Sequence, residues 1–94
     1  MEKKAKIEIE YSKNAYNFFE EHLLVKENFI EKLKALYIFG DKNVDIKILK
    51  GITPRQYRMR IGDYRIIFNV TKKIVRVYSI FVLKADSRGN IYKK

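Results

Sequence analysis

The chain has 94 residues, no cysteine and one histidine, and its formal net charge at pH 7 is +10. This length supports one domain, residues 1–94, with a single modest core, and an apolar content of 47% predicts a globular protein. The absence of cysteine excludes a disulfide scaffold, a thiolate metal site and a cysteine nucleophile. A lone histidine excludes a multi-histidine metal site, so we expect neither a metal ion nor another cofactor.

The sequence shows no targeting or membrane segment. The charged N-terminal residues are not followed by a hydrophobic run, so no signal peptide is expected. No stretch approaches the roughly 18 apolar residues that a transmembrane helix needs. We therefore expect a cytoplasmic protein with no membrane partner.

Charge is divided unevenly between the two halves of the chain. Residues 1–45 contain eight lysines and nine acidic residues, a net charge of −1. Residues 46–94 contain seven lysines and six arginines against two acidic residues, a net charge of +11, and the two halves sum to +10. Because guanidinium groups bind phosphate bidentately and stay protonated, this half predicts a nucleic acid or an acidic protein as partner.

The first half of the chain predicts one strand and two helices. Lys6–Tyr11 alternates between apolar and charged residues, as a half-exposed strand does. Ser12 stands at the N-cap position of a helix over Lys13–Leu24. The predicted apolar face of this helix is formed by Tyr16, Phe19 and Leu23.

A break near Val25 and Lys26 separates this helix from a second one over Glu27–Phe39, which Gly40 caps. His22 lies among charged residues and is expected to be a solvated surface residue. The short connection predicts an antiparallel helical hairpin packed on one face of a sheet. The predicted buried stripe of the second helix is Phe29, Leu33, Leu36 and Tyr37.

The second half predicts the sheet. Asp45–Lys50 alternates and is either a short strand or an extended approach, and Gly51–Pro54 turns the chain. A turn at Thr71–Lys73 precedes the apolar run Ile74–Leu83, which we expect to be the central strand or its neighbour. Lys84–Lys94 is a polar, basic segment.

The fold class expected from these elements is α+β in two layers. An N-terminal strand leads to an antiparallel two-helix hairpin, which packs on a three- to four-stranded, mostly antiparallel sheet.

The most informative stretch is Tyr57–Phe68, which reads as two strands joined at a tight turn, Gly62-Asp63. A two-residue turn would place Ile61 opposite Tyr64, Arg60 opposite Arg65, and Arg58 opposite Ile67. Arg58, Arg60 and Arg65 would then share one face, although like charges directly opposite each other are destabilising. No acidic residue of these two strands points to that face. The pattern is typical of a site that binds an anion, with a polyphosphate chain as the best fit, and the alternative is a solvated basic surface.

These residues resemble the RelE/ParE toxin superfamily, and within it the archaeal RelE proteins. The resemblance rests on the order of elements, the Leu49-Lys50-Gly51 turn, the Tyr57–Phe68 hairpin and the closing Arg88-Gly89-Asn90-Ile91-Tyr92-Lys93. It implies the toxin of a type II toxin–antitoxin pair, an endoribonuclease that cuts mRNA in the ribosomal A site. It also implies a RelB-like antitoxin, which binds operator DNA together with the toxin.

The resemblance also implies roles for individual residues. RNA can be cleaved without metal by attack of its own 2′-OH on the adjacent phosphate, and fixed cations would stabilise the phosphorane that forms. The residues expected to carry this chemistry are Arg58, Arg60, Arg65, Arg88 and Tyr92. The further residues expected to contact RNA are Lys50, Arg55, Lys84 and Lys93.

The sequence departs from the family pattern at two places. Some members have lysines where Arg58 and Arg60 stand, and an arginine cannot act as a base. The general base is therefore unassigned, with Tyr92 and Lys84 as candidates. Leu83–Asp86 replaces a Gly-His-Arg-like stretch that many of these sequences have after the last strand.

Two alternatives remain open. One is a nucleic-acid-binding module without cleavage activity, which the same basic face would serve. The other is a ParE-like toxin that inhibits DNA gyrase by protein contact and does not need the arginines. For either toxin, we expect an acidic amphipathic segment of the antitoxin to lie across the basic face or the helical hairpin.

Overall fold

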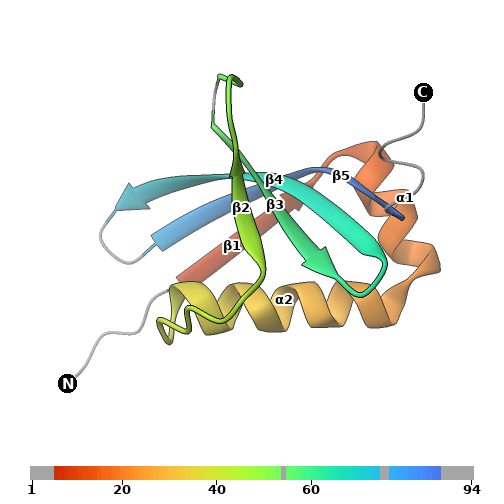
Figure 1. Ribbon diagram of the computed structural model, residues 1–94, viewed down its shortest axis with the longest axis horizontal. Coiled ribbons are helices and arrows are strands. Elements are labelled where there is room, and N and C mark those ends of the chain that lie inside the picture. The colour runs from red at the N-terminus through yellow and green to blue at the C-terminus, as the bar shows by residue number, and fades with distance from the viewer. Residues whose placement is uncertain (1–5, 54, 75–76, 88–94) are drawn as a thin grey trace.

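The structure is a computed structural model that describes residues 6–53, 55–74 and 77–87. Two helices pack on one five-stranded sheet in this part of the chain (Figure 1), which confirms the α+β fold class. The elements in chain order are β1 (Lys6–Tyr11), α1 (Lys13–Glu21), α2 (Leu23–Tyr37), β2 (Ile46–Leu49), β3 (Gln56–Ile61), β4 (Tyr64–Ile74) and β5 (Val77–Ser87).

The strands lie side by side in the order β1-β5-β4-β3-β2. β2 to β5 form a four-stranded antiparallel meander, in line with the sequence prediction. β1 adds a fifth strand at the edge and runs parallel to β5, with Ile9 opposite Ile80. The helices supply the long crossover that a parallel pair requires, because they carry the chain from β1 to the far side of the sheet. β5 therefore lies inside the sheet between β1 and β4, as the apolar run predicted.

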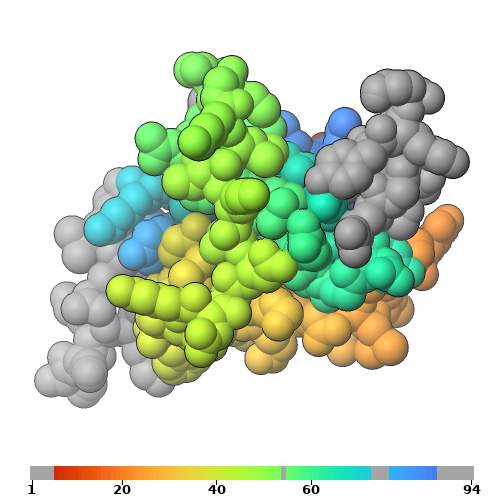
Figure 2. Space-filling view, viewed as in Figure 1, coloured from red at the N-terminus to blue at the C-terminus, as the bar shows by residue number. Residues whose placement is uncertain are grey.

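The sheet is strongly twisted (Figure 1). Figure 1 shows β2 and β3 crossing the direction of β1 and β5 at a steep angle, while α2 runs along the bottom of the view. In the space-filling view of Figure 2, the green end of the β2–β3 hairpin projects at the top of the molecule. β3 still pairs with β4 along its length, so the hairpin stays part of the sheet.

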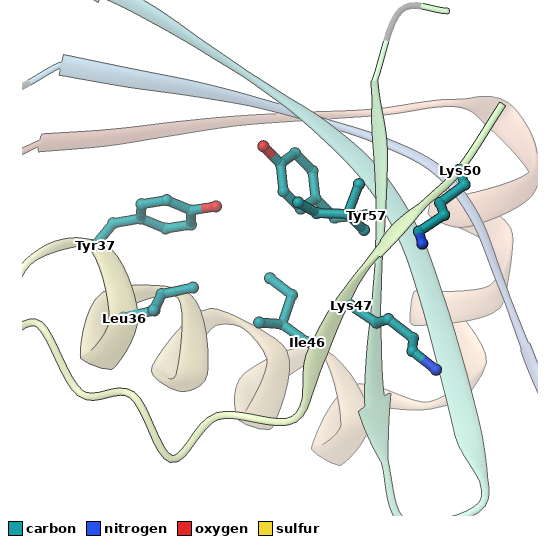
Figure 3. A pocket seen from close by; sticks show the side chains of 7 residues that line it. Leu36, Tyr37, Ile46, Lys47, Lys50 and Tyr57 are labelled. Atoms are coloured by element: carbon teal, nitrogen blue, oxygen red, sulfur yellow. The ribbon is translucent and has the colours of Figure 1, made fainter. Parts of the chain in front are cut away.

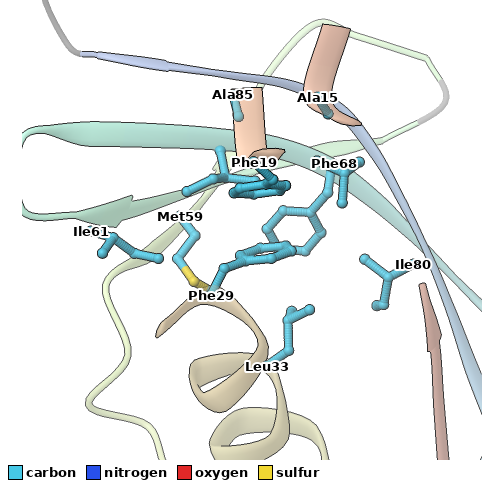
Figure 4. Close-up of a cluster of buried hydrophobic side chains, with 11 residues drawn as sticks. Ala15, Phe19, Phe29, Leu33, Met59, Ile61, Phe68, Ile80 and Ala85 are labelled. Carbon is cyan, nitrogen blue, oxygen red and sulfur yellow. The ribbon is translucent and has the colours of Figure 1, made fainter. Parts of the chain in front are cut away.

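The hydrophobic core lies between the helices and one face of the sheet. Phe29 of α2 stacks on Phe19 of α1 with ring centroids 5.7 Å apart, and it meets the edge of Phe68 at 5.6 Å. Figure 4 shows these three rings together within the cluster. The largest fully buried side chains are Phe19, Phe29, Leu33, Met59, Ile66, Phe68, Ile80 and Val82. The helices thus cover this face, and the arginines of β3 and β4 point to the other face, which we call the open face.

The first helix begins as predicted and ends earlier. The Ser12 hydroxyl accepts a hydrogen bond from the Ala15 N–H at 3.1 Å, which confirms the N-cap. The predicted break near Val25 and Lys26 is wrong, because α1 ends at Glu21 and the backbone turns at His22, with φ −135° and ψ 66°.

His22 is half-buried, so its prediction as a solvated surface residue is wrong. Its ring stacks on Phe18 with centroids 4.1 Å apart and lies 5.3 Å from the Tyr64 ring. Its Nδ1 lies 2.9 Å from the Phe18 carbonyl oxygen, which can only accept, so Nδ1 is the donor. These contacts hold the junction of the two helices against the turn end of β4.

The predicted apolar face of the first helix is only partly correct. Phe19 is buried, whereas Tyr16 is 52% exposed and Leu23, at the start of α2, is 57% exposed. Ala15 takes the core position instead. The predicted stripe of the second helix is correct, since Phe29 and Leu33 are fully buried and Leu36 and Tyr37 are half-buried.

The second helix spans Leu23–Tyr37 rather than the predicted Glu27–Phe39, so it begins and ends earlier, and Gly40 follows shortly after its end. Gly40 has a φ of 73°, which a residue without a Cβ adopts readily, and its N–H donates to the Leu36 carbonyl oxygen at 3.2 Å. The next N–H, of Asp41, donates to the Ala35 carbonyl oxygen at 2.8 Å. These bonds satisfy carbonyl groups that the end of a helix leaves without partners.

The predicted turn at Thr71–Lys73 is wrong, because these residues belong to β4. Thr71 lies opposite Ser79 on the open face, and Lys72 lies opposite Tyr78 on the face that the helices cover, because successive residues of a strand alternate between the faces. The strand after it begins at Val77 and continues to Ser87, beyond the predicted end at Leu83. None of the helices in the described ranges is long and apolar enough to cross a membrane.

Candidate nucleic-acid interface

The arginine hairpin has the register that the sequence predicted. Ile61 lies opposite Tyr64, and Arg60 lies opposite Arg65. Gly62 occupies the first turn position with a φ of 58°. Because residues opposite each other in an antiparallel pair share a face, and residues two apart on a strand do so too, Arg58 joins the other two arginines on the open face.

Two carboxylates lie beside these arginines, and neither comes from β3 or β4. Asp45, just before β2, accepts a backbone hydrogen bond from the Arg60 N–H through its own carbonyl, at 3.0 Å, and therefore lies opposite Arg60. Asp86 of β5 lies opposite Arg65. Asp45, Arg60, Arg65 and Asp86 thus form a cross-strand row, here called the mixed row, with two positive charges between two negative ones. The sequence prediction considered only the two strands of the hairpin and missed both carboxylates.

Asp45 also reaches Arg58, which lies one position further along the open face. Its Oδ1 lies 3.4 Å from Arg58 Nη2, and its Oδ2 lies 3.9 Å from Arg60 Nε. The carboxylate itself is half-exposed, at 53% of its side chain. One solvent-facing carboxylate therefore holds two guanidinium groups in place.

The three arginines differ in accessibility. Arg65 is 4% exposed and Arg58 is 8% exposed, whereas 35% of the Arg60 side chain is exposed. The buried Nε atoms of Arg58 and Arg60 make no hydrogen bond within the described residues. Buried donors of this kind favour an additional acceptor, such as a phosphate oxygen.

A second cross-strand row lies next to the mixed row on the open face. Lys47 lies opposite Arg58, Arg58 opposite Ile67, and Ile67 opposite Lys84. We call Lys47, Arg58, Ile67 and Lys84 the basic row, since it carries three positive charges and no acidic residue. Lys47 and Lys84 are exposed. Sequence reasoning missed Lys47, although its alternation with Ile46 and Ile48 places it on the same face as Arg58 once β2 pairs with β3.

The remaining predicted site residues do not all gather here. Lys84 lies on the open face within the basic row. Arg55 and Lys50 are exposed in the connection between β2 and β3, and Lys50 lines a hollow on the other side of the hairpin. Arg88, Tyr92 and Lys93 lie outside the described residues.

A hollow of about 330 Å³, here called the open-face hollow, adjoins the basic row. Its position follows from the register, because Leu49 lies opposite Gln56 and Ile67 opposite Lys84. A bulge in β5, where the register shifts between Ile67 and Phe68 of β4, leaves Leu83 without an opposite residue, and Leu83 lines the hollow with the others. The bulge has no local sequence signal, which is why the hollow could not be predicted.

A larger hollow, of about 500 Å³, lies between α2 and the β2–β3 hairpin. Figure 3 shows Leu36 and Tyr37 of α2 facing Ile46 and Tyr57, while the ammonium end of Lys47 points away from them. Burial raises the pKa of Tyr37 to about 12, and the nearby Tyr57 and Tyr78 add to the increase. This hollow is mainly apolar and does not include the arginines.

Among the residues that the structure describes, no group of three or more histidine, cysteine, aspartate or glutamate side chains could hold a metal ion. Around the mixed and basic rows, the open face thus offers guanidinium and ammonium cations, the carboxylates of Asp45 and Asp86, the amide of Gln56 and an apolar hollow.

Comparison with known proteins identifies the fold. No protein-family model and no curated protein matches the sequence. The chain is similar to one in the crystal structure of the RelB–RelE antitoxin–toxin complex from Methanococcus jannaschii, with a TM-score of 0.61 and 23% identity over 88% of this chain and 94% of that chain. The chain has a RelE-like fold. The resemblance seen in the sequence is therefore confirmed at the level of the fold, and the RelE-like sheet is what brings the mixed and basic rows together.

Proposed function

We propose that this chain is the toxin of a type II toxin–antitoxin pair and that it is an endoribonuclease, which cleaves mRNA in the ribosomal A site. The observation that carries the proposal is that a RelE-like fold gathers Arg58, Arg60 and Arg65 on the face that the helices leave open. The adjacent basic row extends this positive surface by two lysines. A single-stranded polyanion fits such a surface.

The proposed reaction uses the RNA itself as the nucleophile. A general base takes the proton of the 2′-OH, whose oxygen attacks the adjacent phosphorus and forms a phosphorane with additional negative charge. The bond from phosphorus to the 5′-oxygen then breaks, a general acid protonates this oxygen, and a 2′,3′-cyclic phosphate remains. Preorganised cations stabilise such charge most effectively where water is partly excluded. Arg60 and Arg65 are directly opposite each other, and Asp45 and Asp86 flank them in the row, so we propose that the mixed row supplies this charge and that no metal ion is needed.

The roles divide between the two rows. The basic row would bind backbone phosphates on either side of the cleaved bond, because it carries three cations and no carboxylate. In the mixed row Arg60, the most accessible of the three arginines, would contact the reacting phosphate. Lys84 and Tyr92 stay the candidates for the general base, together with Arg88 as a further phosphate ligand.

The proposed partner is a RelB-like antitoxin, since the similar solved structure is a RelB–RelE complex. A net charge of +10 suits an acidic segment that covers the open face and competes with RNA. Operator DNA would be bound only by the toxin–antitoxin complex. We propose that the protein acts in the cytoplasm, where ribosomes and mRNA are found.

Two assays separate this function from its rivals. Purified protein added to a cell-free translation reaction should stop synthesis, whereas DNA supercoiling by gyrase should continue at its normal rate. Loss of supercoiling with intact translation would instead indicate a gyrase-directed toxin. RNA binding without any effect on translation would indicate a binding module. Lys13→Ala removes one exposed positive charge from α1, so it is the control for the loss of a charge in variants of the site arginines.

A further inference from the structure

We infer that the open-face hollow binds one nucleobase of the RNA and that Gln56 reads the edge of this base. The inference rests on the proposed function and extends it, because it names a specificity-determining residue next to the phosphate-binding rows. The hollow is lined by Leu49, Gln56, Ile67, Leu83 and Lys84.

Gln56 lies close to Arg58 of the basic row. Gln56 stands two residues before Arg58 on the same face of β3, so the two side chains arise about 6.6 Å apart. Ile67 and Lys84 belong both to the basic row and to the lining of the hollow. A phosphate held by Arg58 therefore places an adjoining nucleoside over the hollow.

The size and the lining of the open-face hollow suit one nucleobase. A volume of about 330 Å³ is at the lower end of the roughly 300–1,000 Å³ seen for ligand pockets, which suits one base better than a larger ligand. Leu49, Ile67 and Leu83 offer apolar surface to the face of a base. Lys84 is exposed at the rim and offers a cation to the backbone.

The amide of Gln56 can recognise the edge of a base. Gln56 is half-buried, and its amide provides a donor and an acceptor side by side. Glutamine amides pair with the edges of bases, and the pair with adenine is the most common. Among the described residues that line the hollow, Gln56 is the one whose side chain offers both a donor and an acceptor. It therefore determines which base is preferred, and adenine is expected to bind best.

The test measures binding separately from cleavage. A randomised pool of 2′-fluoro RNA hexamers, which lack the attacking hydroxyl, is bound to the protein, and the bound fraction is sequenced. Affinities of the selected hexamer are then measured for the wild type and for Gln56→Ala, Gln56→Glu and Asn69→Ala. Asn69 is the matched control, because it is an amide of β4, opposite Phe81, outside the hollow. Thermal melting of each variant verifies that it folds.

The wild type should enrich one base at one position, and an abasic nucleotide there should weaken binding about tenfold. Gln56→Ala should weaken binding of the preferred hexamer about tenfold and remove the preference. Gln56→Glu keeps the size of the side chain and loses the amide donors, so it should change which base is preferred. Asn69→Ala should stay within twofold of the wild type.

An unchanged base preference and affinity in both Gln56 variants would overturn the inference and leave the proposed function intact. Failure of the wild type to bind any hexamer at low salt would contradict both the inference and the RNA-directed function. The two failures are thus distinguishable.

Discussion

Asp45 forms ion pairs with two of the three arginines of the open face, although it lies on neither of their strands. It contacts Arg58 and Arg60 at once, and it lies on an edge of the sheet with half of its side chain in water. A single carboxylate of this kind offsets the repulsion between neighbouring guanidinium groups while the site is empty. A phosphate that enters the site would compete with it for the same donors.

Replacing Asp45 with asparagine should therefore have opposite effects on stability and on RNA binding. The free energy of unfolding should fall by about 1 kcal/mol, because the ion pair is partly exposed and its carboxylate is still half in water. Affinity for RNA should rise, because a competing anion is lost. Urea unfolding and filter binding measure the two effects. Asp41→Asn, in the same connector, removes an equal charge from a carboxylate that accepts a hydrogen bond from the Asn43 N–H. Weaker RNA binding by Asp45→Asn than by this control would refute the competition.

The raised pKa of Tyr37 predicts how the stability of the fold depends on pH. Its pKa is raised from 10.0 to about 12 in the folded protein, chiefly by burial and further by Tyr57 and Tyr78. Between pH 10 and 12 Tyr37 is therefore deprotonated in the unfolded chain but still protonated in the folded protein. Its contribution to stability is complete below pH 10 and declines as the pH rises toward 12. In Tyr37→Phe, stability measured by urea unfolding should fall less steeply across this window than in the wild type. Tyr16→Phe, which changes an exposed tyrosine, should follow the wild type.

At the scale of elements, Ser12 connects the first helix to the sheet. Its hydroxyl accepts from the Ala15 N–H and donates to the Leu83 carbonyl oxygen at 2.7 Å. The second bond holds the bulged part of β5, which lines the open-face hollow. One side chain therefore fixes both the start of α1 and the strand distortion beside the candidate site.

Ser12→Ala should lower the free energy of unfolding by about 1–2 kcal/mol, since it removes an N-cap and a further hydrogen bond that is partly buried. Ser12→Thr retains the hydroxyl and should lose clearly less. Urea unfolding followed by circular dichroism measures both. Equal stability of the alanine and threonine variants would show that the hydroxyl contributes nothing.

The elements that could be predicted are those whose signals are local. The strand Lys6–Tyr11 and the hairpin register around Gly62-Asp63 follow from alternation and turn chemistry alone, and both are confirmed. The helix boundary at His22 could not be predicted, because it depends on ring contacts with Phe18 and Tyr64. The extent of β4 could not either, because Thr71 and Lys72 look like turn residues until β5 pairs with them.

At the scale of the whole molecule, the candidate site also combines residues that the local sequence reveals with residues that only strand pairing brings together. The arginines were visible because they lie within one hairpin. Asp45 and Lys47 join them only through the pairing of β2 with β3, and Asp86 only through that of β5 with β4. The complete sheet converts an apparently uncompensated cluster into two rows, one mixed and one basic. Under the proposed function, the mixed row would supply fixed catalytic charge and the basic row an adjoining surface for the RNA backbone.

The most direct test of this arrangement is primer extension on mRNA held in translating ribosomes, with wild-type protein, Arg60→Ala and the control Lys13→Ala. The wild type and the control should produce cuts at the A-site codon. Arg60→Ala should reduce the cleavage rate about 100-fold, since it removes a cation aimed at the charge that develops in the transition state. Undiminished cutting by folded Arg60→Ala, or no cutting by the wild type, would contradict the proposal that the mixed row is the catalytic centre of a ribosome-directed nuclease.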